Sequence, residues 1–205
     1  MDQRDVVRAG YDELADAYDE HRTEETHVGF EADVTQRFFD DRSPDSRVLD
    51  AGCGAGRPVL QTIARDHDAV GLDLSTTMLD RSREHVPDAA LVQGDLGALP
   101  FPDDAFDAVV SLYAIIHVPK TEHERVLSEF RRVLRPGGEV LVSMGAIEGW
   151  EGRNDDWLDA GAAMEWSYYG PEQSREIVES AGFAVVDERV PAVESDGFSV
   201  FRGRA

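Results

Sequence analysis

The sequence contains little cysteine and no long apolar run, and both shortages limit what the protein can be. Its one cysteine, Cys53, excludes a disulfide within the chain, and no group of cysteines and histidines has the spacing of a zinc site. No apolar segment approaches the ~20 residues that span a bilayer, and the acidic N-terminus lacks the apolar segment of a signal peptide. We therefore expect a soluble, cytoplasmic protein with no bound metal.

Basic residues are also scarce. The chain has 20 basic residues against 42 acidic ones, a formal net charge of -22, and Lys120 is its one lysine. Such a field repels phosphate backbones, so nucleic acid is excluded as a partner and no membrane partner is expected. An acidic surface with almost no lysine resembles proteins of extreme halophiles, and the near-absence of lysine favours that interpretation over an ordinary acidic enzyme.

The stretch 47–58 organises the rest of the chain. Val48 and Leu49 indicate the end of a buried parallel strand, residues 50–56 a glycine-rich turn, and Pro58 the first turn of a helix. Glycine lets backbone amides approach a ligand closely, and a helix N-terminus attracts negative charge. Strand, glycine turn and helix together predict a nucleotide-cofactor site.

The spacing of the glycines argues against a nicotinamide dinucleotide. The G-x-G-x-x-G/A fingerprint requires a small third residue, but that position is Arg57 or Val59, depending on which glycine pair is counted. Asp50 precedes the first glycine by two residues. Its carboxylate would repel a pyrophosphate, but it could hold a cationic or hydroxyl-bearing ligand.

Residues 48–56 closely resemble the first motif, D/E-x-G-x-G-x-G, of the class I S-adenosylmethionine-dependent methyltransferases. The resemblance implies S-adenosyl-L-methionine as cofactor, with the turn beneath its methionine part and an acid that contacts its amino group. The cofactor-binding residues it implies here are Asp50, Ala51, Gly52, Cys53 and Gly54. The alternative is a glycine turn without a ligand.

Two downstream segments add to this resemblance. Asp73 ends the second strand, where an acid is placed to accept both ribose hydroxyls. Residues 70–75 resemble the family's V-x-G-x-D-x-S motif, which implies that Leu74 and Met78 pack beside the adenosine, although Met78 could be core alone. Residues 95–107 resemble a stretch ending L-P-F-x-D-x-x-F-D, which implies that Asp95 accepts from the adenine amine and that the Leu96 amide faces the ring.

The core alternates strand and helix, which predicts a Rossmann-like α/β fold with a doubly wound seven-stranded sheet. The sheet should be mostly parallel, with a C-terminal antiparallel hairpin strand formed by the segments 183–190 and 198–202. Ser75 should cap the helix after the second strand. The T-x-x-E sequence at 121–124 predicts a capping box for a later helix, and the 134–138 turn resembles the family's L-K/R-P-G-G.

Two N-terminal helices, about 2–21 and 28–41, should form a lid. Residues 11–18 resemble the Y-D-x-x-A-x-x-Y segment of many small-molecule methyltransferases, which implies that tyrosines of this helix reach the site. Tyr18 is accordingly predicted to contact the cofactor and Tyr11 the substrate. Alternatively, both tyrosines only pack the helix onto the core.

The segment after the fourth strand should wall the reacting centre, because ligands bind beyond the carboxyl ends of parallel strands. The resemblance places residues 111–113 near the methyl group, with Ser111 on the cofactor and Tyr113 on the substrate. His117 is the residue here whose proton could move near neutral pH, so it is the candidate general base. Alternatively, it packs against the next helix.

Residues 146–170 are irregular and aromatic and hold all three tryptophans of the chain. Long connections are often functional, and Trp166 and Tyr169 are predicted to contact a small, partly apolar acceptor. The alternative is a satellite hydrophobic patch.

We thus predict one methyltransferase domain: lid helices (1–45), cofactor-binding core (46–145), substrate-side insertion (146–170) and C-terminal helix and hairpin (171–205). The predicted function is in-line transfer of a methyl group to a small molecule. A non-catalytic S-adenosylmethionine-binding protein and an NAD-dependent oxidoreductase are the alternatives, and the oligomeric state is open.

Overall fold

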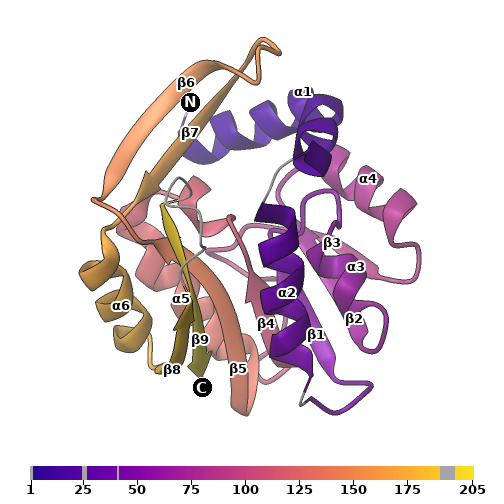
Figure 1. The fold of residues 1–205 in the computed structure, drawn as a ribbon, viewed down its shortest axis with the longest axis vertical. Coiled ribbons are helices and arrows are strands. Elements are labelled where there is room, and N and C mark those ends of the chain that lie inside the picture. The colour runs from indigo at the N-terminus through magenta and orange to yellow at the C-terminus, as the bar shows by residue number, and fades with distance from the viewer. Residues whose placement is uncertain (1, 25–26, 41, 190–196) are drawn as a thin grey trace.

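The computed structural model describes residues 2–24, 27–40, 42–189 and 197–205, and a seven-stranded sheet lies at its centre (Figure 1). The strands are β1 (Arg47–Ala51), β2 (Asp68–Asp73), β3 (Ala90–Gln93), β4 (Phe106–Ser111), β5 (Leu134–Gly145), β8 (Ala184–Arg189) and β9 (Phe198–Arg204). Their order across the sheet is β3-β2-β1-β4-β5-β9-β8, with β1 to β5 parallel and β9 antiparallel to both neighbours. The predicted Rossmann-like, mostly parallel sheet is confirmed; Val190, the predicted end of one strand, lies outside the described residues.

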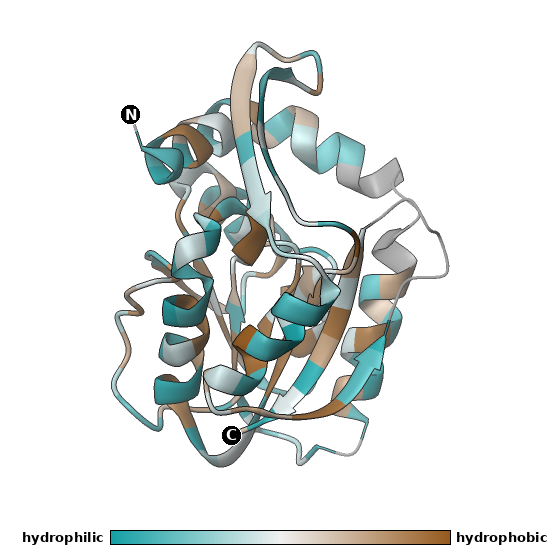
Figure 2. Cartoon of the chain, turned by 90° about the vertical axis from the view of Figure 1, so that its left-hand side faces the viewer, coloured by the Kyte–Doolittle hydropathy of each residue, from teal (hydrophilic) through white to brown (hydrophobic). Residues whose placement is uncertain are grey.

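Helices cover both faces of this sheet, as expected for strands that are apolar on both sides. One face packs against α2 (His27–Phe39), α3 (Val59–Ile63) and α4 (Thr76–His85), and the other against α5 (His123–Val133) and α6 (Pro171–Ser180). In Figure 2 the hydrophobic colours concentrate in the central strands, while the outer sides of the helices are mostly hydrophilic. Val34, Phe38 and Phe39 of α2 are buried, as predicted.

The helix ends follow the sequence in one case and depart from it in another. Ser75 caps α4, since its Oγ accepts from the Met78 amide at 3.1 Å, as predicted. The predicted capping box at 121–124 is wrong. Residues 120–122 form a 3-10 turn, α5 begins only at His123, and its N-cap residue Glu122 makes no side-chain capping bond. The Glu122 carboxylate instead bonds Arg4 and Arg125.

Helix α1 (Gln3–Glu24) lies across the carboxyl ends of the strands, along the top of the view in Figure 1. Its apolar stripe is split between two partners. Val7 and Leu14 pack with Ala162 and Met164, whereas Ala15 packs with the glycine turn and α4. Both lid helices therefore form close to their predicted ranges; Asp41, the predicted end of the second, lies outside the described residues. Within the described residues, no helix is long and apolar enough to cross a bilayer.

The aromatic segment predicted to be irregular is in fact a regular hairpin. β6 (Trp150–Trp157) and β7 (Ala162–Tyr168) pair antiparallel as a separate two-stranded sheet that projects beside α1 (Figure 1). The sequence of β6 does not predict a strand, because most of its residues are exposed and polar and apolar residues do not alternate clearly along it. One side of β7 is buried on α1, which gives the hairpin its place in the fold.

Candidate active site

The glycine turn after β1 has the backbone that its sequence predicts. Gly52, Gly54 and Gly56 have φ values of +88°, +52° and +82°, a region that residues with a Cβ rarely adopt. A Cβ on Gly52 would lie 2.2 Å from Cβ of Ala114, whereas a Cβ on Gly54 would meet no atom within 4 Å. The turn therefore fits tightly against the 112–117 segment at one glycine and leaves open space at the next.

That open space belongs to two adjoining cavities of about 100 and 280 Å³ beyond the carboxyl ends of β1, β2 and β4. Both are lined by Tyr18, Gly52, Gly54 and Tyr113. We call the smaller one, which reaches Asp73 and Asp95, the adenosine cavity, and the larger one, which reaches Asp50 and Arg57, the methionine cavity. Together they form one elongated site with an acid at each predicted position.

Asp50 gives the methionine cavity a buried carboxylate in need of a cation. The residue is 2% exposed, and its Oδ2 has no hydrogen-bond partner among the described residues. Burial raises the pKa of Asp50 well above its usual range, and the charges of Asp73 and Glu31 add to this rise. An ammonium group would supply the missing partner, and Arg57 in the same cavity could meet a carboxylate. These groups fit the amino-acid end of S-adenosylmethionine.

Asp73 lines the adenosine cavity with its carboxylate held by the backbone. Its two oxygens accept from the amides of Gly54 and Ser75, each at 2.9 Å. Burial raises the pKa of Asp73, and these two hydrogen bonds counter that rise. A carboxylate has about four lone-pair positions, so it retains capacity for hydroxyl donors. Leu74 and Met78 line the same cavity and contribute to its apolar surface, and their packing beside the adenosine stays a prediction.

Asp95 and Leu96 lie at the far end of the adenosine cavity, where the adenine is predicted. Asp95 Oδ1 accepts from the Gly97 amide at 2.7 Å, and its Oδ2 pairs with Nε of Arg4 at 2.7 Å. Arg4 comes from the first turn of α1, which brings the lid helix into direct contact with the predicted adenine acceptor. Nothing in the sequence links these two residues, which are far apart along the chain.

His117 lines the adenosine cavity with a defined hydrogen-bonding state. Its Nδ1 lies 3.0 Å from the carbonyl oxygen of Glu165 and its Nε2 lies 2.9 Å from the hydroxyl of Tyr11. Since a carbonyl only accepts, Nδ1 carries the proton, and Nε2 accepts from Tyr11. Burial lowers the pKa of His117 to about 4, so the ring is neutral at pH 7. The imidazole is therefore a proton acceptor that already holds the Tyr11 hydroxyl.

Other residues predicted for the site lie farther from the cavities. Ser111 is fully buried and donates through Oγ to the carbonyl of Ala51 at 2.7 Å, so both residues join β1 to β4 beneath the site. Trp166 stacks obliquely on His117, with ring centroids 5.8 Å apart, and supports the site from behind. Tyr169 packs against His123 at the start of α5 and lines neither cavity.

Tyr18, Tyr113 and Cys53 line the cavities, and their predicted contacts with cofactor and substrate stay predictions. Tyr18 and Tyr113 line both cavities, and Cys53 lines the methionine cavity, where burial raises the pKa of its thiol. Sequence reasoning missed two polar lid residues. Asp12 accepts from Ser75 Oγ at 2.6 Å, and Gln3 donates to the His117 carbonyl at 3.1 Å. Their one signal was their place on the helix that also carries Tyr11 and Tyr18.

Comparison with known proteins gives the same assignment as the geometry. A family model described as a methyltransferase domain (Methyltransf_25) matches residues 48–138. A protein of Encephalitozoon cuniculi named as a methyltransferase is 32% identical over 170 residues, covering 75% of this chain and 78% of its own length. The malonyl-[acyl-carrier protein] O-methyltransferase of Erwinia pyrifoliae is 34% identical over 142 residues; the match covers 68% of this chain but only 51% of that enzyme.

Solved structures share the fold at lower identity. The 1,6-didemethyltoxoflavin-N1-methyltransferase of Burkholderia thailandensis, solved with 1,6-didemethyltoxoflavin and S-adenosylhomocysteine, superposes with a TM-score of 0.75 at 19% identity, over 97% of this chain and 87% of that one. The sequence relatives, the fold and the cofactor-shaped site agree. The chain therefore belongs to the family of S-adenosylmethionine-dependent methyltransferases.

Proposed function

We propose that this protein transfers a methyl group from S-adenosylmethionine to a small-molecule acceptor whose reacting atom carries a proton. The observation that carries the proposal is the Tyr11–His117 pair, which faces the same cavity as the carboxylates of Asp73 and Asp95. A proton-accepting pair beside a cofactor site is the arrangement that such a transfer needs.

Binding and orientation fall to the acids of the two cavities. Asp50 and Arg57 would hold the amino-acid end of the cofactor, Asp73 its ribose and Asp95 its adenine. When bound, the cofactor supplies a methyl group already activated by the positive charge on sulfur. The main task of the protein is then to hold the acceptor atom in line with that methyl group, by proximity and orientation.

Proton removal falls to Tyr11 and His117. Because His117 Nε2 accepts from the Tyr11 hydroxyl, an acceptor that approaches through the cavity meets this hydroxyl in front of the imidazole. The tyrosine would take the acceptor's proton as it passes its own to Nε2. The Glu165 carbonyl keeps the other ring nitrogen protonated, which orients the imidazole for this transfer.

The walls of the site support a partly apolar acceptor. Tyr11 and Tyr18 stack edge to face, and both contact Trp157 of the hairpin, with ring centroids 6.0 and 5.6 Å away. The acidic charge of the chain argues against a nucleic-acid acceptor. The Burkholderia neighbour binds 1,6-didemethyltoxoflavin, which agrees with a small-molecule acceptor here. The same charge supports our proposal that the protein works in a salt-rich cytoplasm.

Calorimetric titration in molar KCl tests the cofactor half of the proposal. We expect S-adenosylmethionine and S-adenosylhomocysteine to bind, NADH not to bind, and Asp73→Ala to lose affinity for both sulfur ligands. Binding of NADH alone would contradict the proposal and favour an oxidoreductase.

Methyl transfer itself is tested by detection of a methylated product. Incubation with cell extract and methyl-labelled cofactor should yield a labelled small molecule with the wild type. Tight cofactor binding with no labelled product would favour a protein that only binds the cofactor.

A further inference from the structure

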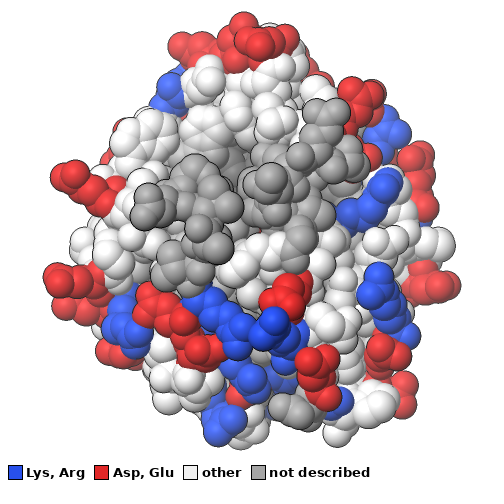
Figure 3. Space-filling view, viewed as in Figure 1, with Lys and Arg blue, Asp and Glu red and all other residues white. Residues whose placement is uncertain are grey.

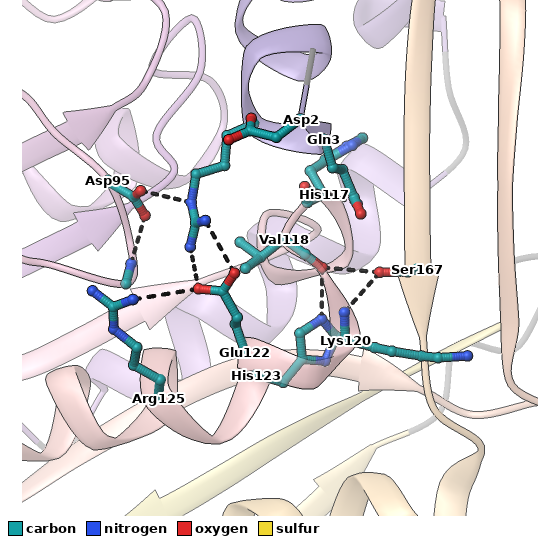
Figure 4. A network of polar contacts seen from close by, with 12 residues as sticks. Asp2, Gln3, Asp95, His117, Val118, Lys120, Glu122, His123, Arg125 and Ser167 are labelled. Carbon is teal, nitrogen blue, oxygen red and sulfur yellow. Dashed lines mark hydrogen bonds and ion pairs between the residues drawn. The ribbon is translucent and has the colours of Figure 1, made fainter.

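The first turn of the lid helix α1 is tied to three parts of the site at once. Arg4 reaches Asp95 in the adenosine cavity and Glu122 before α5, and its neighbour Gln3 bonds the carbonyl of His117. Figure 4 shows Asp95, Glu122 and His117 around this end of the helix, with dashed lines joining Asp95 and Glu122 to it. One helical turn thus touches the predicted adenine end and the proton-accepting end of the site.

The contacts of Arg4 are those of a bidentate clamp rather than a surface pair. Nε lies 2.7 Å from Asp95 Oδ2, Nη1 lies 3.0 Å from Glu122 Oε1, and Nη2 bonds the second Glu122 oxygen. The three side chains are 24%, 33% and 28% exposed, so solvent screens them only in part. Bidentate guanidinium–carboxylate pairs in such settings are stronger and more specific than exposed pairs.

This clamp acts on the carboxylate that the adenine amine needs. The Gly97 amide donates to Asp95 Oδ1, and the Arg4 guanidinium lies beside Oδ2 as an ion partner whose Nε–H makes no hydrogen bond among the described residues, so a hydrogen bond holds one oxygen and a charge lies beside the other. An ionised carboxylate only accepts hydrogen bonds. The Asp95 carboxylate has about four lone-pair positions, so it can still accept from an amine donor. A carbonyl at the same place would be a second acceptor and would be repelled.

We propose that Arg4 is a positioning residue that couples closure of α1 to recognition of the cofactor's adenine amine through Asp95. The inference rests on the proposed function. Arg4 need not touch the cofactor; it orients the acid that does, and it does so only when α1 lies on the site. Discrimination for the amine and closure of the lid are then one event.

The test compares two ligands that differ at the amine. S-adenosylhomocysteine carries it, and S-inosylhomocysteine has a carbonyl in its place. Both are titrated by calorimetry into the wild type, Arg4→Gln and Arg83→Gln at the same KCl concentration. Arg83 is the control because it pairs with Asp80 of its own helix, α4, at 2.6 Å and lines neither cavity.

We expect Arg4→Gln to weaken the binding of S-adenosylhomocysteine about tenfold, because Asp95 loses its ion-pair partner. S-inosylhomocysteine should change less than about twofold, so the preference for the amine falls. Arg83→Gln should keep the wild-type preference. Amide hydrogen exchange of residues 3–24 in the S-adenosylhomocysteine complex should be faster in Arg4→Gln alone.

Three results would overturn the inference. Tighter binding of S-adenosylhomocysteine by Arg4→Gln would mean that Arg4 competes with the amine. Equal loss of affinity for both ligands would mean that Arg4 only holds α1 on the site. Unchanged affinity for both would mean that the Arg4 contacts do not affect binding. Failure of the wild type to bind S-adenosylhomocysteine would instead contradict the proposed function.

Discussion

At the scale of single residues, Gly52 and Gly54 separate two reasons for glycine in one turn. Both have positive φ, but only Gly52 also lies against another segment, where an added Cβ would clash with Ala114. Gly54 faces the cavities. The same motif therefore contains one position set by packing and backbone together, and one set by backbone and ligand.

We expect Gly52→Ala to destabilise the fold by roughly 3 kcal/mol, since left-handed backbone costs about 1–2 kcal/mol and overpacking about 1–3 kcal/mol. Gly54→Ala should cost only about 1 kcal/mol, from the backbone alone, yet weaken cofactor binding. Urea denaturation in molar KCl measures the first effect and calorimetry the second. Equal stability of the two variants would contradict this account.

The Tyr11–His117 pair predicts an unusual pH profile. Because the pKa of His117 is lowered to about 4, the imidazole stays unprotonated through neutral and mildly acidic pH. We expect kcat to stay level from about pH 6 to 8 as far as His117 is concerned, with no fall near the ordinary histidine pKa of ~6.5. A wild-type kcat that falls by half near pH 6.5, with no such fall in His117→Ala, would contradict this assignment.

Removal of the Tyr11 hydroxyl should affect chemistry more than binding. We expect Tyr11→Phe to lower kcat by about 10²–10⁴-fold, the usual range for lost acid–base catalysis, because Nε2 of His117 loses the hydroxyl that it holds. The KM for S-adenosylmethionine should change little. Tyr18→Phe is the matched control on the same helix, and an equal drop in kcat there would point to packing instead.

His123 makes stability depend on pH. Burial lowers its pKa to about 4, against ~6.5 in the unfolded chain, so the unfolded state takes up this proton first as the pH falls. Its contribution is present above pH ~6.5 and is lost progressively towards pH ~4 at about 1.4 kcal/mol per unit. Nε2 lies 3.0 Å from the Val118 carbonyl, a bond that Gln could keep.

We expect His123→Gln to flatten the fall in unfolding free energy between pH 6.5 and 4.5 by that slope. Denaturant titrations of wild type and variant across this range measure it. If the unfolding free energies of wild type and variant fall in parallel with pH, His123 is not the cause of this loss of stability in acid.

At the scale of elements, α1 and the β6–β7 hairpin depend on each other. Gly10 is the point of closest approach: a Cβ there would lie 2.5 Å from the carbonyl oxygen of Ala163 and 3.0 Å from the Met164 methyl group. The absence of a side chain lets the helix lie directly on the strand, which brings Tyr11 to His117.

Gly10→Ala should have two opposing effects on the stability of α1, a gain in helix propensity and a loss of packing. Alanine in a helix gains about 1 kcal/mol over glycine, but the clash with backbone of β7 outweighs this gain. We expect faster amide exchange in residues 3–24 and weaker cofactor binding. Gly161→Ala in the hairpin turn is the comparison: its Cβ would meet no atom within 4 Å, so only the backbone strain of its φ of +81° acts there. A Gly10→Ala protein with a more protected α1 would contradict the packing argument.

The sequence predicted the core elements well because each carried a local signal. The glycine-rich turn at 50–56 and the cap at Ser75 mark element ends that local interactions decide. The hairpin at 150–168 carried no such signal, since its exposed polar strand is fixed by its partner. At Thr121 the opposite holds: a local capping signal was present, but a 3-10 turn forms there instead.

The candidate site shows the same division. Asp50, Asp73 and Asp95 line the cavities because motif spacing places them at strand ends. Arg4 and Asp12 could not be read from the sequence, because their roles depend on how α1 lies across the sheet. Ser111, chosen by resemblance, is held beneath the site by the Ala51 carbonyl.

At the scale of the whole molecule, charge is unevenly arranged. Figure 3 shows basic side chains gathered low on the visible face and acidic ones spread around its edge. Low on the sheet, Arg42, Arg202 and Arg204 all bond the buried carboxylate of Glu139, whose pKa is lowered by these arginines against the effect of burial. Acids therefore dominate the remaining surface and repel one another.

Salt should relieve this repulsion. The Debye length falls from about 10 Å at 0.1 M to about 3 Å at 1 M, so we expect the melting temperature to rise by on the order of 10 °C between 0.1 and 2 M KCl. Sorbitol at equal osmolality separates screening from solvent exclusion. A melting temperature that sorbitol raises as much as KCl would contradict an electrostatic origin.

The position of Tyr11 on the lid has a consequence for timing. Its hydroxyl meets His117 from α1, so the proton-accepting pair is complete only while this helix lies across the carboxyl ends of the strands. Any movement of α1 that admits a ligand takes the pair apart, and proton removal then waits until the helix returns.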